Sequence, residues 1–388
     1  MADQFSEVSS QSWFSRIGGA IKGVLFGFVL LVVAFPLLFW NEGRAVKRYK
    51  TLKEGERAVE SVAADRVDPQ HEGKLVHLTG IATTEETVAD PVFAISAKAL
   101  KLQRVAEVYQ WEETKKTSTQ KTLGGGTTTE TTYNYQKVWS TRIIDSSTFK
   151  EAAGHANKPA VFGSADFTAS RVTVGAFRLS PSLLAKINNY TNLTVAADGQ
   201  IPVALKDKVQ VSGAGFYAGK NVQAPEVGDA RITFQVITPT EVSLVAKQVA
   251  GTFEPYFAKN GGRVELLQIG AHDAAAMFQT EEEHNAILTW VLRGVGFGIM
   301  LIGLALILNP LAVLVDIIPW LGGLIGAGIF FIAVSIAAVF SLLTIAVAWV
   351  VYRPLLGVAL IVVAGAVMVL IVKKLKKPTA TPQSAPTV

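Results

Sequence analysis

The sequence has no cysteine and only five histidines, which limits the chemistry that it can carry. Without cysteine, disulfides, thiolate metal sites and cysteine nucleophiles are all excluded. The histidines show no metal-ligand spacing such as HExxH, the glycine run at 124–126 lacks the Lys-Ser/Thr of a phosphate-binding loop, and no GxSxG nucleophile elbow occurs. We therefore predict no metal, no cofactor and no enzymatic activity. A membrane hydrolase would need a cluster of Asp, Glu or His that the sequence order hides.

Charge is missing from long stretches near both ends of the chain. Residues 17–40 carry only Lys22, and 295–315, 317–351 and 354–372 carry no charge. A helix of roughly 20 apolar residues crosses the hydrocarbon core of a bilayer, so each stretch is long enough to span it. The alternative, buried helices of a soluble core, fits poorly with three such runs in series.

The first apolar run has the features of a permanent anchor. It is too long for a typical signal peptide and has no small-x-small cleavage site before Trp40. Gly19, Gly23 and Gly27 recur every four residues, which puts them on one helix face where another helix can approach closely. We predict that these three glycines are helix-packing positions. The polar residues before the run form either a short interfacial helix or a disordered tail.

The remaining charges are evenly balanced. The chain carries 36 Lys and Arg against 31 Asp and Glu, and its surplus lies in the apolar segments and in a C-terminal cluster that begins at Lys373. The segment between the first two spans is close to neutral and has no basic face. This argues against nucleic acid as a partner.

Residues 41 to about 270 have the pattern of β structure, and the segment after Gly270 has a helical composition that leads into the second span. Short alternating or β-branched runs such as KVWSTRIID (137–145) and ARITFQVI (230–237) are separated by Gly, Pro and Asp turns. The Gly and Thr tract at 122–135 predicts a mobile hairpin tip. LVHLTG and KVQVSG, each followed by an aspartate that opens a strand (Asp90 and Asp229), hint at a repeat and hence at two similar β subdomains.

The predicted fold is an α+β membrane protein with four transmembrane helices and a large β-rich extramembrane domain. The segments in chain order are an N-terminal segment 1–16, transmembrane helix 17–40, the β-rich domain 41–288, transmembrane helices 291–315, 320–350 and 354–372, and a basic tail 373–388.

The side of the membrane is not fixed by charge. Lysines between 373 and 377 favour a cytoplasmic C-terminus, because cytoplasmic loops are rich in Lys and Arg. The basic residues between Arg44 and Lys53 favour a cytoplasmic β-rich domain instead. With four spans, both termini lie on one side, so these two predictions conflict.

Several stretches together are typical of one family. They are WNEGRA (40–45), EVYQWEE (107–113), TTYNYQKVWSTRIIDSSTF (131–149), GHAN (154–157), PEVGDARITF (225–234), VSLVAKQ (242–248), TWVLRGVGF (289–297), VDIIP (315–319) and YRPL (352–355). On these residues the chain resembles the transmembrane protein 43 family, also called LUMA, from Trp40 to Leu355. The lack of cysteine and the compact tail resemble a bacterial branch of that family.

The resemblance implies four spans with the large domain between the first two. It also implies a lumenal domain, which in a bacterium would be periplasmic, with both termini cytoplasmic and Arg44–Lys53 outside the cytoplasm. In eukaryotes the family is linked to the endoplasmic reticulum and inner nuclear membrane, through lamin and emerin partners. It supplies no catalytic residue. The candidate interaction or signature residues are Trp40, Asn41, Glu42, Gly43, Arg44, Tyr109, Trp111, Tyr133, Tyr135, Trp139, Pro225, Glu226, Gly228, Asp229, Arg293, Asp316 and Arg353.

Two functions fit these features. The first is a membrane scaffold that acts through self-association and through contacts of its extracytoplasmic domain with lipids or other membrane proteins. Its predicted partners are the lipid bilayer, further copies of the chain and other membrane proteins, but not nucleic acid. The alternative is a lipid-handling or transport protein with an apolar cavity. The aromatic candidates are either core or interface residues.

Overall fold

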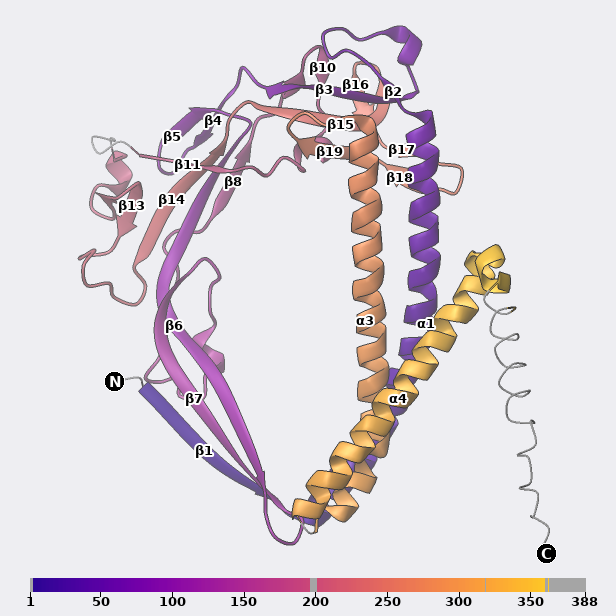
Figure 1. Cartoon of the computed structure of the whole chain (residues 1–388). Coiled ribbons are helices and arrows are strands. Elements are labelled where there is room, and N and C mark those ends of the chain that lie inside the picture. The colour runs from indigo at the N-terminus through magenta and orange to yellow at the C-terminus, as the bar shows by residue number, and fades with distance from the viewer. Residues whose placement is uncertain (1–2, 196–200, 318, 360–361, 363–388) are drawn as a thin grey trace, which may run out of the picture. The chain divides into compact units, whose positions relative to one another are not determined.

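The computed structural model describes residues 3–195, 201–317, 319–359 and 362, with the backbone alone for 319–324. The chain divides into two compact units (Figure 1). The first, called here the β-rich unit, is formed by Met1–Ser12 and Lys50–Glu283. The second, the helical unit, is formed by Trp13–Tyr49 and His284–Val388. The predicted combination of apolar helices with a large β-rich domain is confirmed.

The largest sheet of the β-rich unit has eight strands within the described residues. Its path is β1 (Asp3–Gln11), β7 (Thr127–Ser140), β6 (Lys101–Lys121), β14 (Ala230–Ile237), β13 (Gly215–Ala218) and β12 (Gln210–Ser212), with β11 (Thr191–Leu193) beside β14 and β8 (Ala165–Thr168) beside β6. All these pairings are antiparallel.

A second sheet has seven strands in the same part of the chain. It contains β10 (Phe177–Arg178), β9 (Thr173–Val174), β3 (Leu75–Thr83), β15 (Thr240–Val249) and β16 (Thr252–Glu254), with β19 (Leu266–Ile269) beside β15 and β2 (Glu60–Ser61) beside β3. The smaller elements are the pairs β4 (Thr87–Asp90) with β5 (Ile95–Lys98) and β17 (Tyr256–Phe257) with β18 (Arg263–Val264), helix α2 (Pro181–Leu184), and 3-10 turns at Pro69–His71, Ser146–Thr148 and Val203–Leu205.

The two sheets share one hydrophobic core. Alternate residues of β14 are buried, as expected where one face of a strand meets a core. Its Ile232 and Phe234 belong to the same cluster as Leu78 of β3 and Leu244 of β15. The predicted equivalence of Asp90 and Asp229 is wrong, because Asp90 ends β4 whereas Asp229 precedes β14.

The hairpin of β6 and β7 forms a long arm, with β1 along its β7 side (Figure 1). Its tip is a turn over 122–126, closed by a hydrogen bond from the Thr122 N–H to the Gly126 carbonyl at 2.9 Å. Gly124 and Gly125 have φ of +83° and +79° there, which glycine adopts without steric cost. The predicted tip is therefore present at 122–126, but the prediction is wrong for 127–135, which lie in β7 with Tyr133 and Tyr135 buried. Strand β1 replaces the helix or disordered tail that we expected for the N-terminal segment.

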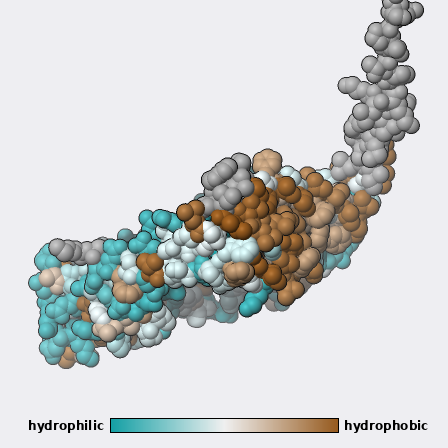
Figure 2. Space-filling model, turned by 90° about the horizontal axis from the view of Figure 1, so that it is seen from below, coloured by the Kyte–Doolittle hydropathy of each residue, from teal (hydrophilic) through white to brown (hydrophobic). Residues whose placement is uncertain are grey.

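Among the described residues, three long helices are apolar and long enough to cross a membrane: α1 (Trp13–Ala58), α3 (Ala274–Val315) and α4 (Pro319–Tyr352), the last over Ile325–Tyr352. Large apolar side chains on all three are exposed, Phe331 to 74% for example. Figure 2 shows this hydrophobic surface gathered over the helices. An apolar exterior of this kind is solvated by lipid tails rather than by water.

The predicted spans match the apolar parts of these helices, but α1 is much longer than predicted. It continues from Trp40 to Ala58 because its following residues are mostly Lys, Arg, Glu, Ala and Leu, which favour helix. The last turns of α1 and the first of α3 lie in the β-rich unit, where Leu52 packs with Phe278 and Val264. The predicted fourth span, 354–372, is helical at 354–359 and 362, and its other residues lie outside the described part of the chain.

Candidate functional site

A buried ion pair joins the three helices of the helical unit at one end. The Glu42 carboxylate on α1 accepts hydrogen bonds from Arg293 of α3, at 2.7 Å from Nε and 2.9 Å from Nη2. The indole N–H of Trp349 on α4 donates to the same carboxylate at 2.7 Å. Glu42 is fully buried, and the two-pronged contact with a guanidinium fixes its direction.

A second polar group lies beside this pair, between α1 and α3. The Arg44 guanidinium donates to Asn285 Oδ1 at 3.0 Å and to Thr289 Oγ1 at 2.9 Å. Asn41 is buried, and its amide donates to the Thr289 carbonyl at 3.0 Å. Polar side chains that hydrogen-bond between helices hold apolar helices together where water is scarce.

The remaining candidate residues near this ion pair are Trp40, Gly43 and Arg353. Gly43 faces the Tyr352 ring, and a Cβ placed on it would lie 2.6 Å from that ring. Trp40 is exposed. Arg353 follows α4, with its guanidinium 6.0 Å from the centre of the Trp349 ring. The residues of WNEGRA, TWVLRGVGF and YRPL thus meet at one end of the helical unit.

The opposite end of α1 is fixed in a similar way. Arg16 donates to Asp316 Oδ2 at 2.6 Å, and the Trp13 indole donates to the Val313 carbonyl at 2.8 Å. Arg16 and Glu42 are separated by about 39 Å along α1, given a rise of about 1.5 Å per residue. The apolar part between the two ion pairs therefore matches the thickness of a bilayer core of about 30 Å with its interfaces. Arg293 and Asp316, two of the candidate signature residues, thus each take part in an ion pair with α1.

The glycine face of α1 meets α3 at two of its three positions. A Cβ on Gly27 would lie 2.6 Å from the Gly303 carbonyl oxygen, so the two backbones are in direct contact. A Cβ on Gly23 would lie 3.7 Å from Leu306. Gly19 has no atom within 4 Å of the equivalent position among the described residues. Close approach of backbones at small residues is a common way to pack helices in membranes.

In the β-rich unit, an aromatic cluster forms around His155 of the GHAN stretch. Its ring stacks on Tyr135 at 3.8 Å and meets the edge of Trp111 at 4.7 Å. Its two ring nitrogens face the Glu151 carbonyl at 2.7 Å and the Asp3 carboxylate at 2.9 Å. His155 thereby ties the first strand to the loop after β7.

Asn157 of the same stretch completes the cluster at the edge of β6. Its amide oxygen accepts from the Trp111 N–H at 2.6 Å, and its amide nitrogen donates to the Trp111 carbonyl at 3.0 Å. One side chain therefore takes the place of a neighbouring strand at this residue.

The hydroxyl group of Tyr135 makes two hydrogen bonds. Its hydroxyl donates to Glu113 Oε2 at 2.8 Å and accepts from the Glu151 N–H at 3.0 Å. Burial, together with the hydrogen bond to Glu113, raises the pKa of Tyr135 to about 12. Tyr133, two residues earlier, donates to Glu7 of β1 at 2.9 Å. The pKa of Tyr133 is also raised, mainly by this bond to a carboxylate.

The PEVGD turn (225–229) lies against the start of the arm. The Gly228 N–H donates to the Tyr109 carbonyl at 2.8 Å, and the Tyr109 N–H donates to the Asp229 carbonyl at 2.8 Å. The Asp229 carboxylate accepts from the Tyr217 hydroxyl and from the Glu226 N–H. Gly228 has φ of +101°, a conformation that needs glycine.

The aromatic pair beside this turn is Tyr109 and Trp139, with ring centres 5.0 Å apart. The Arg231 guanidinium lies 4.0 Å from the centre of the Trp139 ring. The turn begins at Pro225. Tyr109, Gly228 and Asp229 fix the start of the arm through the hydrogen bonds given above.

The stretches with the strongest resemblance therefore build two structural clusters, one in each unit. A comparison with protein families gives the same identification: the model described as "Transmembrane protein 43" matches residues 108–354. The chain belongs to the transmembrane protein 43 family. Together with its apolar helices, this makes it an integral membrane protein.

Individual relatives agree over most of the chain. Transmembrane protein 43 of the rat is 34% identical and covers 88% of this chain and of its own length. The human protein is 33% identical over 96% of this chain and 94% of its own length. The Drosophila melanogaster homolog is 31% identical over 88% of this chain and 92% of its own length. No solved structure matches the chain.

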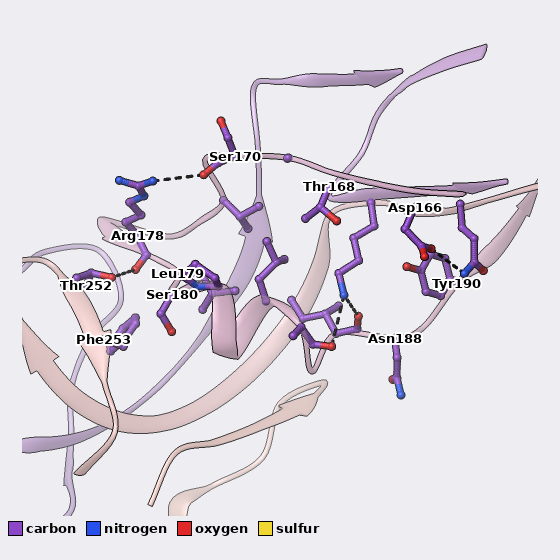
Figure 3. Close-up of a pocket in the computed structure, with 18 residues that line it drawn as sticks. Asp166, Thr168, Ser170, Arg178, Leu179, Ser180, Asn188, Tyr190, Thr252 and Phe253 are labelled. Atoms are coloured by element: carbon purple, nitrogen blue, oxygen red, sulfur yellow. Dashed lines mark hydrogen bonds between the residues drawn. The ribbon is translucent and has the colours of Figure 1, made fainter. Parts of the chain in front are cut away.

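The β-rich unit also contains a cavity of about 950 Å³. It is lined by residues of β6, β8, β10, α2 and β16 (Figure 3). Two cations, Lys101 and Arg178, line it together with one acid, Asp166. Sequence reasoning missed this cavity and the helix-borne partners Asn285, Thr289 and Trp349, because no pattern in the chain shows which distant side chains meet.

Proposed function

We propose that this chain is a multi-pass membrane scaffold that self-associates and organises protein or lipid contacts through its β-rich unit. Family membership and the apolar helices support the membrane part of this proposal. The proposal assigns the chain no catalytic activity and no cofactor. The observation that carries it is the arm formed by β1, β7 and β6.

The arm has open edges. β14 pairs with β6 only over Lys101–Val108, whereas β7 pairs with it up to Lys121. Past Trp111, β6 has no strand on its other side among the described residues. The same holds for the outer side of β1. Unpaired edge backbone is a template for another strand, and strand addition is a common mode of protein association.

The side chains of this edge limit what can pair with it. The stretch from Thr114 to Gln120 is exposed and contains only Thr, Lys, Ser and Gln. Lysine on an edge strand opposes indiscriminate aggregation. The partner that fits best is a second copy of this chain. Its edge carries the same hydroxyl groups, and an antiparallel register can place the lysines of the two copies away from one another.

The absence of cysteine makes a direct test possible. Single cysteines are introduced in turn from Thr114 to Thr119, in the full chain in membranes, and oxidised. We expect a disulfide-linked dimer at one or two neighbouring positions, because an antiparallel pair of identical edges brings equal residues together only at its centre. Lys220→Cys, on an exposed loop, is the control. Equal crosslinking at Lys220, or a strictly monomeric mass in native mass spectrometry, would refute self-association.

The proposed topology has residues 41–288 outside the cytoplasm, 354–372 as a fourth span and 373–388 in the cytoplasm. It places the protein in a bacterial cytoplasmic membrane with a periplasmic domain, or in the endoplasmic reticulum or inner nuclear membrane of a eukaryote. The lysine tail and the family resemblance support it. Reporter fusions or protease sites at residues 120–130 test it, since cytoplasmic access there would overturn it.

The N-terminal segment is the most informative part of this topology. A single crossing by α1 puts residues 3–11 in the cytoplasm, whereas pairing of β1 with β7 requires both strands on one side. A label at Ser9 and one at Leu123 separate the two arrangements. Equal accessibility from outside supports the strand pairing, and opposite accessibility supports the single crossing.

The second candidate function is lipid handling or transport. The cavity of about 950 Å³ in the β-rich unit favours it, because ligand sites are commonly concave and largely apolar. Transfer of a fluorescent lipid between vesicles by the reconstituted protein is the test. A transfer rate equal to that of protein-free vesicles would argue against this function.

A further inference from the structure

The cavity lined by Lys101 and Arg178, called here the Lys101 cleft, has a buried cation in its wall. Lys101 begins β6 and is only 8% exposed. Its ammonium group donates to the Ile187 carbonyl at 2.7 Å and weakly to the Ala185 carbonyl at 3.5 Å. Both acceptors are neutral. A buried ammonium usually has a carboxylate partner, because removing a charge from water is costly.

No carboxylate forms a direct ion pair with Lys101 among the described residues. Asp166, the acid of the cleft, attracts the ammonium group only from a distance and accepts a hydrogen bond from the Gln103 amide at 2.8 Å. Burial accordingly lowers the pKa of the Lys101 ammonium. An anion entering the cleft would restore the charge balance that the protein leaves incomplete.

A second cation reaches the same cleft. Arg178 of β10 is exposed, and its guanidinium makes one long hydrogen bond, to the Ser170 carbonyl at 3.4 Å (Figure 3). The charged lining residues are Lys101 and Arg178 against Asp166, an excess of one positive charge. The cleft is therefore electrostatically complementary to a single negative charge.

The rest of the lining is part polar and part apolar. Val172, Ile187 and Phe253 are buried in the core beneath it, and the accessible apolar surface is formed by Pro181, Ala185 and Tyr190. A free inorganic anion would leave this surface in contact with water. A ligand with an aliphatic chain would cover it, which stabilises binding by about 0.8 kcal/mol for each buried CH₂.

We propose that the Lys101 cleft binds a single-chain amphiphile with an anionic end group, either a carboxylate or a phosphate monoester. The end group lies on Lys101, and the chain lies along the accessible apolar surface. This inference rests on the second candidate function, lipid handling or transport, because it names the class of ligand that such a protein would bind. It does not require that the ligand be moved between membranes.

A purely structural role for Lys101 is the competing explanation. Its ammonium group holds the carbonyls that follow α2, as lysines often do at helix ends. In that case Lys101 would matter for folding, but no anion would bind. The two explanations differ in whether the affinity depends on the charge of the ligand.

The test uses the full chain in phosphatidylcholine nanodiscs at pH 7, with empty nanodiscs to subtract partitioning. Equilibrium dialysis compares octanoate, octyl phosphate, octanol and inorganic phosphate. We expect saturable binding of one octanoate or octyl phosphate per chain, and at least tenfold weaker binding of octanol and of inorganic phosphate. The stronger of the first two identifies the end group. Absence of saturable binding, or equal binding of octanol and octanoate, overturns the proposal.

Variants connect this binding to the cleft. Lys101→Met keeps the length of the side chain, removes its charge and is expected to weaken octanoate binding at least tenfold, while Lys220→Met leaves it unchanged. Ala185→Trp, at the exposed rim, should block the cleft with Lys101 intact, and it carries the test if Lys101→Met fails to fold. Unchanged binding in a folded Lys101→Met or in Ala185→Trp refutes the site. Binding without vesicle transfer supports the cleft and rejects only the second candidate function.

Discussion

Each of the two units contains a buried pair of a carboxylate and a guanidinium, and the two pairs are built differently. In the β-rich unit, both oxygens of Asp90 accept from Arg104 Nη1, at 3.0 and 2.8 Å. Asp90 also accepts from the backbone N–H groups of Val92 and Phe93, two and three residues ahead. Every donor to Asp90 therefore comes from within 14 residues of it.

The pair in the helical unit has no local support. Glu42 accepts from Arg293 and from Trp349, which are 251 and 307 residues away. Both carboxylates are fully buried. The β-rich pair thus fixes one corner of a sheet, whereas the helical pair exists only when three helices have packed. The comparison predicts that loss of the cation is more damaging in the helical unit.

The largest effect is expected for Arg293→Met. It leaves the Glu42 carboxylate buried with one donor, Trp349, and breaking a buried ion pair in this way costs about 3–5 kcal/mol. Thermal unfolding of the purified full chain, followed by circular dichroism, measures the loss. The double variant Glu42→Gln with Arg293→Met should recover much of it, because no buried charge remains. Equal stability of the single and double variants would contradict this account of the helical unit.

Arg104→Met should cost less, about 2–3 kcal/mol, although it too leaves a buried carboxylate. Asp90 retains two backbone donors, and hydrogen bonds to a charged group stabilise by about 1.5–3 kcal/mol each. Urea unfolding of the full chain, monitored by the near-ultraviolet signal of the β-rich unit, tests the order. A loss larger than that of Arg293→Met would reverse the comparison. Lys98→Met, which removes an exposed ion pair with Glu85, is the control.

The glycine face gives a third test within the helical unit. Gly27→Val should separate α1 from α3, because the new side chain meets the Gly303 backbone; overpacking of this kind costs about 1–3 kcal/mol. Gly19→Val is the matched control, since that position is open. Both variants add the same side chain to the same helix. Equal losses of thermal stability would show that the contact with Gly303 does not hold the helices.

The general architecture could be predicted from the sequence because its signals are local. Uncharged runs of about 20 residues give membrane helices, and period-2 runs with Gly and Pro turns give strands. The C-terminal end of α1 could not be predicted. The apolar run stops at Trp40, while the helix continues to Ala58 through polar residues that favour helix. Apolarity predicts where lipid ends, not where a helix ends.

The contacts of the candidate residues could not be predicted either. Glu42, Arg293 and Trp349 were noticed as single residues, or not at all, because nothing in the chain indicates that they meet. β1 was missed for a related reason: its run of Ser, Gln and Glu has a weak strand signal, and its pairing partner lies more than 100 residues away. Register between distant segments is set by the folded partner and not by local propensity.

The smallest expected effect lies in the aromatic cluster of the β-rich unit. Tyr135→Phe keeps the stacking on His155 and removes the hydroxyl that joins Glu113 to the Glu151 N–H, at a cost of about 1–2 kcal/mol. The pKa of this tyrosine is about 12 in the folded protein, against about 10 when unfolded. The folded protein therefore holds the proton more tightly, so the contribution of Tyr135 is complete below pH 10 and is lost as the pH rises toward 12.

Urea unfolding of the full chain at pH 8, 10 and 11 gives the measurement. The difference in unfolding free energy between the native chain and Tyr135→Phe should be largest at pH 8, slightly smaller at pH 10, where about half of the unfolded tyrosine is deprotonated, and clearly smaller at pH 11. Tyr49→Phe, at an exposed position on α1, corrects for the general effect of alkali. A difference that stays constant up to pH 11 would mean that Tyr135 is not held in its protonated form by the cluster. The aromatic signature would then contribute only packing to the β-rich unit, unlike the charged signature of the helices.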